Sequence, residues 1–459
     1  MVKTKSSDGI RVSIVLSVVF STSIAVVLVL GFFSQKIEVF FRFDSGSRGE
    51  SRVKIAELLA AAPGRDEFRA VISSEFPPRF NSSACTTMPA AARRANNELE
   101  QGVARARAAI RKAASITTNS SVITIKNNGD ILSSKIYRNP RAFYRSYMEM
   151  ERRFKIFVYE EGDLPLVHDG PCKDIYSSEG RFIHEMEHGT NRFRTRNAKA
   201  AHVYFLPFSV AWMVKYLYNP NTYELTPLKE FVSDYVRLIS TKHPFWNRTQ
   251  GADHFMLSCH DWGPRATQGN PFLYNTSIRV LCNANSSEGF NPQKDVSLPE
   301  IHLYGGSINP KLRLPPKPNI ARPYLAFFAG GVQAQSGLSF STIGKAMTMT
   351  FNGYEVASPR IVEAIYAECI PVILSDHYVL PFSDVLKWEA FSIQVELYDI
   401  PRLKEILMAV SEEKYVELKK GLRSVRRHFV LNQPVDRFDV FHMILHSVWL
   451  RRLNLRSVV

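Results

Sequence analysis

An uncharged run of 22 residues, from Val12 to Phe33, constrains this chain more than any other feature of its sequence. About 20 apolar residues in a helix span a bilayer, whereas the apolar core of a signal peptide has only about 7–15 residues. The run also ends on Gly31-Phe32-Phe33, which is a poor cleavage site. We therefore expect residues 12–33 to form an uncleaved transmembrane anchor, with a cleaved signal peptide and a buried core helix as the alternatives.

The charges that flank this run indicate its orientation. Lys3, Lys5 and Arg11 precede it, and a positively charged flank stays on the cytosolic side of a membrane. Residues 1–11 are therefore expected to form a cytosolic tail, and the rest of the chain is expected to be lumenal. Five Asn-x-Ser/Thr glycosylation sequons agree with a lumenal body, at Asn81, Asn119, Asn247, Asn275 and Asn285.

Length and charge bound the classes of protein that remain. The chain has 459 residues, more than the roughly 250–300 at which a single core stops growing, so at least two domains are expected. Its formal charge is +15, and in a lumenal protein this charge does not indicate a nucleic-acid partner. The charge suits an anionic substrate, such as a nucleotide diphosphate or an acidic polysaccharide, or it belongs to a solvated basic surface.

The segment that follows the anchor, residues 34–135, is expected to form a stem. Its stretch from Ala91 to Ala114 is rich in Ala and Arg and predicts a helix. The apolar face of that helix is thin, so we expect a lone spacer rather than an element of a core.

From residue 136 onward, short apolar strands alternate with helical patterns, which is typical of parallel α/β sheets. The Pro-rich stretch 315–323 is expected to link two Rossmann-like domains, at 136–314 and 315–459. The second domain is expected to end in an amphipathic helix at Phe438–Leu450. In such folds ligands bind at the carboxyl ends of the strands.

The sharpest local motif lies at residues 353–366. Ser358 is a natural N-cap and Pro359 a natural first helical residue, so a helix is expected to begin directly after a glycine-containing loop. The N–H groups at its start suit a phosphate, while nearby carboxylates can hold sugar hydroxyls. The alternative is that Glu363 only pairs with Arg360 on the helix surface. Candidate donor-binding residues are Gly353, Glu355, Ser358, Arg360 and Glu363, together with Gly330 and Gly331 after a predicted strand, where an ordinary turn is the alternative.

Two Asp–His pairs flank the strand predicted at Phe255–Leu257. A carboxylate that orients an imidazole can make a general base, and a structural histidine near a strand end is the alternative. The candidate catalytic residues are Asp253, His254 and Asp261. Glu179 and Arg181 are candidates for the acceptor side of the cleft.

Metal chemistry is not expected. The segment His184–His188 has the HExxH spacing of zinc proteases, but no third-ligand motif follows and Gly189 ends any helix. The chain also lacks an Asp-x-Asp pair, so a cation-independent site is favoured. Of the cysteines, Cys259 and Cys369 are expected to be buried, whereas Cys85, Cys172 and Cys282 are candidates for a disulfide of undetermined pairing.

Several long segments resemble the plant exostosin-like glycosyltransferases of GT47 type. They are KIFVYEEGDLPL from Lys155, GADHFMLSCHDWGP from Gly251, RVLCNANSSEGF from Arg279, DVSLPEIHLYGG from Asp295 and GYEVASPRIVEAIYAECIPVILSDHYVLPFSDVLKW from Gly353. The resemblance covers about residues 135–331 and 351–457. It implies an α/β, GT-B-like fold in a single-pass type II protein of the Golgi membrane.

The resemblance also implies an activity. Such a protein transfers a sugar with inversion from a nucleotide sugar, usually a UDP-sugar, onto a cell-wall polysaccharide such as pectin or hemicellulose, or onto another glycan. The resemblance places Glu355, Arg360 and Glu363 in the donor site. It is also compatible with complexes between this protein and the same or other Golgi glycosyltransferases. No cofactor besides the donor is expected.

The chain departs from that family between Gly331 and Gly353, where relatives have a longer segment. That segment supplies a central strand and basic contacts to the diphosphate, and residues 332–352 show no clear helix or strand pattern. The alternative to an active transferase is therefore a catalytically impaired subunit, and a faulty gene model is a further explanation.

Overall fold

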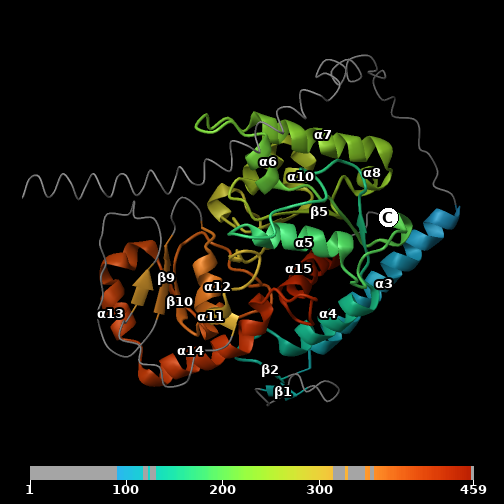
Figure 1. Ribbon diagram of the computed structural model, residues 1–459. Helices are drawn as coiled ribbons and strands as arrows, with labels where there is room; N and C mark the ends of the chain where they lie inside the picture. Colours follow the sequence, from blue (N-terminus) through green and yellow to red (C-terminus); the bar gives the residue numbers. More distant parts are fainter. Residues whose placement is uncertain are drawn as a thin grey trace, which may run out of the picture. The chain divides into compact units, whose positions relative to one another are not determined.

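The computed structural model describes residues 90–116, 122–124, 131–313, 326–328, 347–351 and 356–455. These residues form two parallel β-sheets covered by helices, which confirms the predicted α/β class (Figure 1). A separate antiparallel pair joins β1 (Val122–Thr124) to β2 (Ile131–Ser133). The predicted anchor at 12–33, most of the stem and the linker lie outside the described residues. None of the helices described is both long and apolar enough to cross a membrane.

The first sheet contains five parallel strands whose neighbours follow chain order. They are β3 (Ile156–Val158), β4 (Val203–Phe205), β5 (His254–Ser258), β6 (Ile278–Leu281) and β7 (Val296–Ser297). Arg194 adds a parallel bridge to Ile156 on β3, and the amide of Ile156 donates to the carbonyl of Phe193 at 2.8 Å. The chain therefore visits one neighbour of β3 and then returns to β4 on the other, which is the order reversal of a doubly wound sheet.

Alternating side chains of this sheet face two layers of helices. Phe255 and Leu257 of β5 join one buried cluster, which also takes in α4 (Pro140–Arg153) and α5 (Ser177–His188). Met256, between them, joins the opposite cluster with α6 (Val210–Tyr216) and α7 (Thr226–Lys242). This is the period of two that a strand buried on both faces requires. Shorter helices fill the connections, at α8 (Phe245–Thr249), α9 (Gly263–Ala266), α10 (Pro271–Asn275) and α11 (Pro310–Arg313).

The second sheet contains four parallel strands in the order β11-β10-β9-β8. Their bounds are Ala326–Phe328 for β8, Met347–Phe351 for β9, Ile370–Leu374 for β10 and Ile393–Val395 for β11. Strand β10 packs against α12 (Pro359–Tyr366) on one face and against α13 (Leu403–Met408) and α14 (Glu412–Val425) on the other.

Strand β9 corrects the expectation that residues 332–352 contain no strand. It lies in the centre of the second sheet, where Met347 pairs with both Ala326 and Ile370. Its run Met-Thr-Met-Thr-Phe lacks the β-branched apolar residues that mark a buried strand, and this explains why the pattern was missed. The shortened segment therefore still supplies a central strand.

The last helix, α15 (Val440–Asn454), corrects the predicted amphipathic helix. It is buried along nearly its whole length, and it packs against α4, β6 and β7 of the first sheet rather than against the second sheet. Its arginines are buried as well: Arg451 donates to the carbonyl of Asp295 at 2.8 Å, and Arg452 donates to the carbonyl of His202 at 2.8 Å. Their charge makes the helix look half-solvated in the sequence, although both groups are paired inside the fold.

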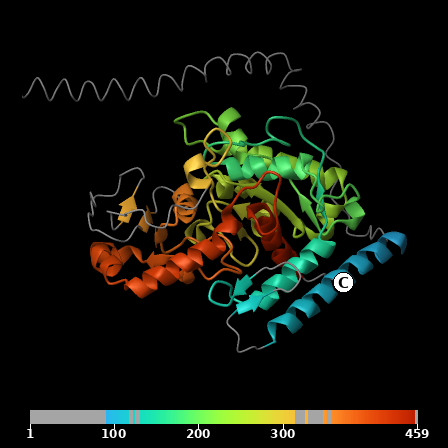
Figure 2. The same ribbon diagram turned by 60° about the horizontal axis from the view of Figure 1, so that its bottom comes forward.

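Helix α3 (Ala90–Ala114) confirms the helix predicted for the stem but corrects its role as a lone spacer. It lies alongside α4 (Figures 1 and 2), and Val103 and Ala106 are fully buried. Arg107 donates to the carbonyl of Leu455 at 2.6 Å. Small side chains make the apolar face thin in the sequence, yet they allow two helices to approach closely.

Replacing Val103 with Asp should therefore destabilise the folded chain by about 3 kcal/mol, because a charge would be buried without a partner. The matched control is Ala104→Asp on the exposed side of the same helix, where helix propensity alone predicts less than about 1 kcal/mol. Urea unfolding of the two variants measures the difference, and equal midpoints would contradict the packing of α3 on the body.

Candidate active site

The carboxyl ends of the two sheets meet at one junction. The amide of Val379, after β10, donates to the carbonyl of Ala284, after β6, at 3.0 Å. Next to it, the amide of Ser286 donates to the carbonyl of His377 at 3.0 Å. Because ligands of parallel α/β sheets bind at these ends, the candidate site lies where the two sets of loops meet.

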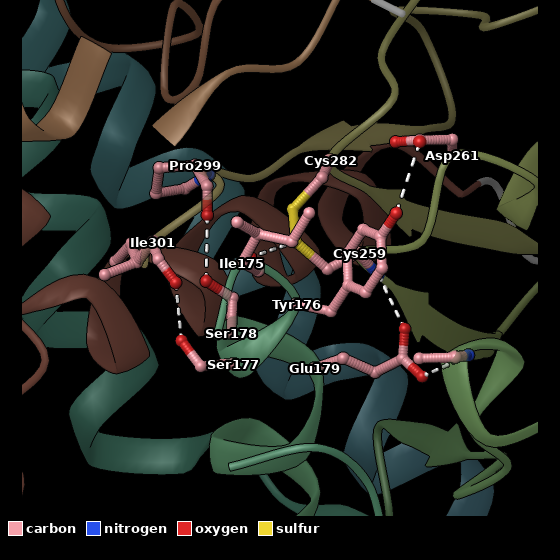
Figure 3. Close-up of a disulfide and its surroundings, with 11 residues drawn as sticks. Ile175, Tyr176, Ser177, Ser178, Glu179, Cys259, Asp261, Cys282, Pro299 and Ile301 are labelled. Carbon is pink, nitrogen blue, oxygen red and sulfur yellow. Dashed lines mark hydrogen bonds between the residues drawn. A yellow bond between two sulfur atoms is a disulfide. The ribbon is translucent and has the colours of Figure 1, made fainter. Parts of the chain in front are cut away.

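A disulfide joins Cys259 to Cys282 at this edge of the first sheet (Figure 3). The two cysteines directly follow β5 and β6, and their Cα atoms are 4.6 Å apart. Cys282 was a candidate for a bridge, but Cys259 was expected to be only a buried thiol. Cys172 and Cys369 are half-buried, and Cys85 lies outside the described residues.

Asp261 lies two residues beyond the disulfide at the carboxyl end of β5. Its carboxylate accepts a hydrogen bond from the hydroxyl of Tyr176 at 3.2 Å, and its backbone carbonyl accepts one from Nδ2 of Asn283 at 2.9 Å. Burial raises the pKa of the Asp261 carboxyl to about 6. A carboxyl with such a pKa, placed at a ligand-binding edge, can exchange a proton near neutral pH.

The other predicted catalytic pair, Asp253 and His254, lies at the amino end of β5 instead. His254 is fully buried, and its ring nitrogens contact Oδ1 of Asp253 at 2.8 Å and the hydroxyl of Tyr159 at 2.8 Å. Arg248 donates to the same aspartate at 2.6 Å. No ring nitrogen is left to reach a substrate, so this pair is a structural network at the wrong edge of the sheet for a ligand.

Glu179 is likewise not an acceptor contact. It is fully buried, and its carboxylate accepts hydrogen bonds from the amides of Cys259 at 2.7 Å and Ala211 at 3.0 Å, and from the hydroxyl of Ser209. Burial raises the pKa of this carboxyl. Glu179 therefore ties the start of α5 to the end of β5 and the start of α6.

Arg181, two residues further along α5, does reach a cavity. It lines a pocket of about 490 Å³ together with residues from the 303–312 and 426–444 segments. It donates to Oε1 of Gln433 at 2.7 Å and to the carbonyl of Gly306. The guanidinium thus links the loop after β7 to the segment that leads into α15.

The predicted donor motif is described from residue 356 onward. Ser358 caps α12 and accepts from the amide of Arg360 at 3.3 Å. Glu363 forms an ion pair with Arg360 and accepts from the hydroxyl of Tyr304, in the first domain, at 3.1 Å. The structure thus brings Ser358, Arg360 and Glu363 together beside the first domain. It also contains the ion pair between Arg360 and Glu363 that the alternative, a purely structural role for Glu363, requires. Gly330, Gly331, Gly353 and Glu355 lie outside the described residues.

The HExxH segment forms the end of α5, which stops before Gly189. The ring centroids of His184 and His188 are 5.1 Å apart. His184 and Glu185 line the same pocket as Arg181. Among the residues that the structure describes, no group of three His, Cys, Asp or Glu side chains could hold a metal ion.

The described sequons differ in their surroundings. Asn247 and Asn275 are exposed, whereas Asn285 is half-buried at the domain junction, where its Oδ1 accepts from the amide of Ser287 at 3.0 Å. Asn81 and Asn119 lie outside the described residues.

Sequence reasoning missed Tyr176, Tyr304 and the pairing of the disulfide. The sequence around Tyr176 and Tyr304 gives no sign of a functional role, because each tyrosine contacts a carboxylate on a distant segment of the chain. The disulfide did leave a signal: Cys259 lies two residues after the strand predicted at Phe255–Leu257, and Cys282 directly follows the apolar residues Val280 and Leu281. Neighbouring parallel strands place such positions side by side.

Comparison with known proteins agrees with this geometry. The chain matches the Exostosin GT47 domain over residues 150–343 and 346–410. It is 58% identical over 386 residues to a probable glycosyltransferase of Arabidopsis thaliana, covering 78% of this chain and 79% of the relative. A second probable glycosyltransferase of that plant is 46% identical over 387 residues, with 79% and 82% covered. The probable beta-1,4-xylosyltransferase IRX10 of Arabidopsis thaliana is 27% identical over 358 residues, with 64% and 82% covered.

Two parallel α/β domains whose carboxyl edges meet, together with these matches, define a glycosyltransferase. The chain belongs to the Exostosin GT47 family, among its plant exostosin-like members.

Proposed function

We propose that the chain is a Golgi glycosyltransferase of GT-B fold that transfers a sugar, with inversion, from a UDP-sugar to a cell-wall polysaccharide or another glycan. The observation that carries the proposal is the position of Asp261, a residue that Tyr176 and Asn283 hold at the edge where the loops of the two domains meet. Burial raises the pKa of its carboxyl to about 6. The names of the relatives support the substrate class, since one is a probable beta-1,4-xylosyltransferase and another, from Oryza sativa subsp. japonica, a probable glucuronosyltransferase.

In the proposed reaction, the acceptor hydroxyl attacks the anomeric carbon while Asp261 takes its proton and UDP leaves. Inversion needs one such base on the acceptor side. A carboxyl whose pKa is about 6 is mostly ionised at pH 7, so it can accept this proton. The neighbouring His260 is not the base we propose, because burial lowers its pKa to about 4 and makes its ring a weak acceptor.

The donor site that we propose lies at the start of α12. Its N-terminal amides and Arg360 suit the diphosphate, and no metal ion is required if they neutralise its charge. Gly330, Gly331, Gly353 and Glu355 belong to the same proposal.

Arg360→Ala should therefore weaken UDP binding at least tenfold, or about 1.4 kcal/mol, because one charge-assisted contact is lost. Arg402→Ala is the matched control, since Arg402 forms the same i,i+3 ion pair on an exposed surface of the second domain. The UDP-induced rise in the thermal midpoint of each variant measures the difference. Equal rises in both variants would place the diphosphate elsewhere.

Location and partners follow from the same proposal. A disulfide at the candidate site suits an oxidising lumen, and Asn247 and Asn275 are exposed enough to carry glycans. We propose a single-pass type II protein, anchored by residues 12–33, that acts alone or in complexes with other Golgi glycosyltransferases.

The test is a transfer assay with the full-length chain in detergent. UDP-xylose, UDP-glucuronic acid and UDP-galacturonic acid are each offered with xylan and pectin oligosaccharides, and UDP release and product mass are followed. We expect transfer from one donor. A folded chain that binds UDP but transfers no sugar would instead support the impaired subunit considered from the sequence.

A further inference from the structure

Two chain segments converge on Asp261. Tyr176, at the start of α5, reaches its carboxylate, and Asn283, after β6, holds its backbone carbonyl. Asn283 directly follows Cys282, and Asp261 lies two residues after Cys259. Figure 3 shows both cysteines and Asp261. The disulfide therefore joins the two loops that carry Asp261 and its backbone partner.

The disulfide lies directly beyond the last pair of the β5–β6 ladder. Ser258 pairs with Leu281, and the amide of Cys282 donates to the carbonyl of Ser258 at 3.1 Å. The Cα separation of 4.6 Å between the cysteines is close to the roughly 4.8 Å between neighbouring strands. The covalent bond thus keeps the two loops at sheet spacing where the ladder ends.

Tyr176 and the residues next to it have contacts of their own. Its backbone forms a parallel bridge with Ile301, and the hydroxyls of Ser177 and Ser178 donate to the carbonyls of Ile301 and Pro299, as Figure 3 shows. Its ring lies against that of His260, with centroids 4.7 Å apart. The phenol hydroxyl is consequently fixed in direction toward the carboxylate.

We propose that Tyr176 and the Cys259–Cys282 disulfide are positioning residues for Asp261. The disulfide fixes the backbone of the loop that carries the carboxylate, and Tyr176 fixes the direction of the carboxylate. The inference rests on the proposed function in one respect, which is the role of Asp261 as the base. The loop after Cys282 also pairs with residues 377–379, so the same bond sets the distance from Asp261 to the second domain.

The charged neighbours of Asp261 give this arrangement a pH signature. Glu288, after β6, raises the pKa of Asp261, and the hydrogen bond from Tyr176 lowers it. His260 stays neutral above about pH 4 and adds no charge. Tyr176→Phe removes a donor that favours the ionised carboxylate, so the pKa of Asp261 should rise.

The test of Tyr176 needs no turnover. Carbodiimide labels protonated carboxyls, and peptide mass spectrometry of the folded full-length chain gives the labelling of Asp261 as a function of pH. We expect a midpoint near pH 6 in the wild type and a higher midpoint in Tyr176→Phe, with Tyr398→Phe, an exposed tyrosine, unchanged. An unchanged midpoint in Tyr176→Phe would overturn this role. If the chain is active, the acidic limb of its rate profile should move in the same direction.

The test of the disulfide is hydrogen exchange of the double variant Cys259→Ala/Cys282→Ala, with Cys172→Ala as the control. Amides of residues 260–262 and 283–286 should exchange at least tenfold faster in the double variant, while those of α12 keep their protection. Unchanged exchange in both loops would overturn the proposal for the disulfide. If the double variant unfolds globally, the same comparison is made on the wild type with and without reductant. Lack of UDP binding or of turnover would refute the proposed function without altering these readouts.

Discussion

Asp261→Asn should lower sugar transfer by about 10²- to 10⁴-fold while UDP affinity stays unchanged. The amide cannot take the proton of the acceptor hydroxyl, and losing a general base has this range of effects. The substitution keeps the shape of the side chain and an oxygen that can accept from Tyr176. Initial rates at saturating donor, together with UDP titration, separate the loss of chemistry from the loss of binding.

Asp234→Asn is the matched control for this variant, because Asp234 lies on the exposed face of α7 and forms a surface ion pair with Arg237. Its rate should equal that of the wild type. If Asp261→Asn retains a rate within about threefold of the wild type, Asp261 is not the base and the proposed mechanism is wrong.

Arg279→Met should destabilise the folded chain by about 3–5 kcal/mol, because it leaves a buried carboxylate without its main partner. Arg279 and Asp295 are both fully buried, and the guanidinium donates to the two carboxylate oxygens at 3.1 and 2.6 Å. It also donates to the carbonyl of Gly289 at 2.7 Å and stacks on Tyr274. The pair joins β6, the strand that leads directly to Cys282, to the turn before β7.

The control is Arg237→Ala, which breaks the exposed ion pair with Asp234 and should cost less than about 1 kcal/mol. Denaturant unfolding of both variants measures the two free energies. A loss below about 1 kcal/mol for Arg279→Met would mean that the other partners of Asp295, Lys294 at 2.5 Å and the amide of Asn291 at 2.8 Å, suffice to hold that carboxylate.

Much of the fold could be predicted because its strands are short apolar runs between recognisable helix starts. The helix predicted to begin at Pro359 after an N-cap at Ser358 starts at that residue in the structure, and the strand predicted at Phe255–Leu257 lies within β5. Strand β9 was missed because threonines alternate with methionines in it, and it is recognised as a strand from its pairing with β8 and β10. The return of α15 to the first sheet is a tertiary contact, which no local pattern reveals.

The candidate site was harder to predict for a related reason. A sequence shows which residues flank a strand, and Asp253 and Asp261 both flank β5. Only the direction of the strand separates them, since Asp261 follows its carboxyl end and Asp253 precedes its amino end. Glu179 was a candidate for the acceptor side of the cleft, yet its carboxylate accepts from backbone amides and a hydroxyl that it meets only in the fold.

The central claim is that this shortened chain still binds a nucleotide-sugar donor, and calorimetric titration of the full-length protein with UDP tests it most directly. We predict saturable binding of one UDP per chain, because β9 completes the second sheet and α12 begins with a capped, Arg-bearing turn. A folded protein that releases no heat with UDP across a range of temperatures, and whose thermal midpoint UDP leaves unchanged, would contradict the claim.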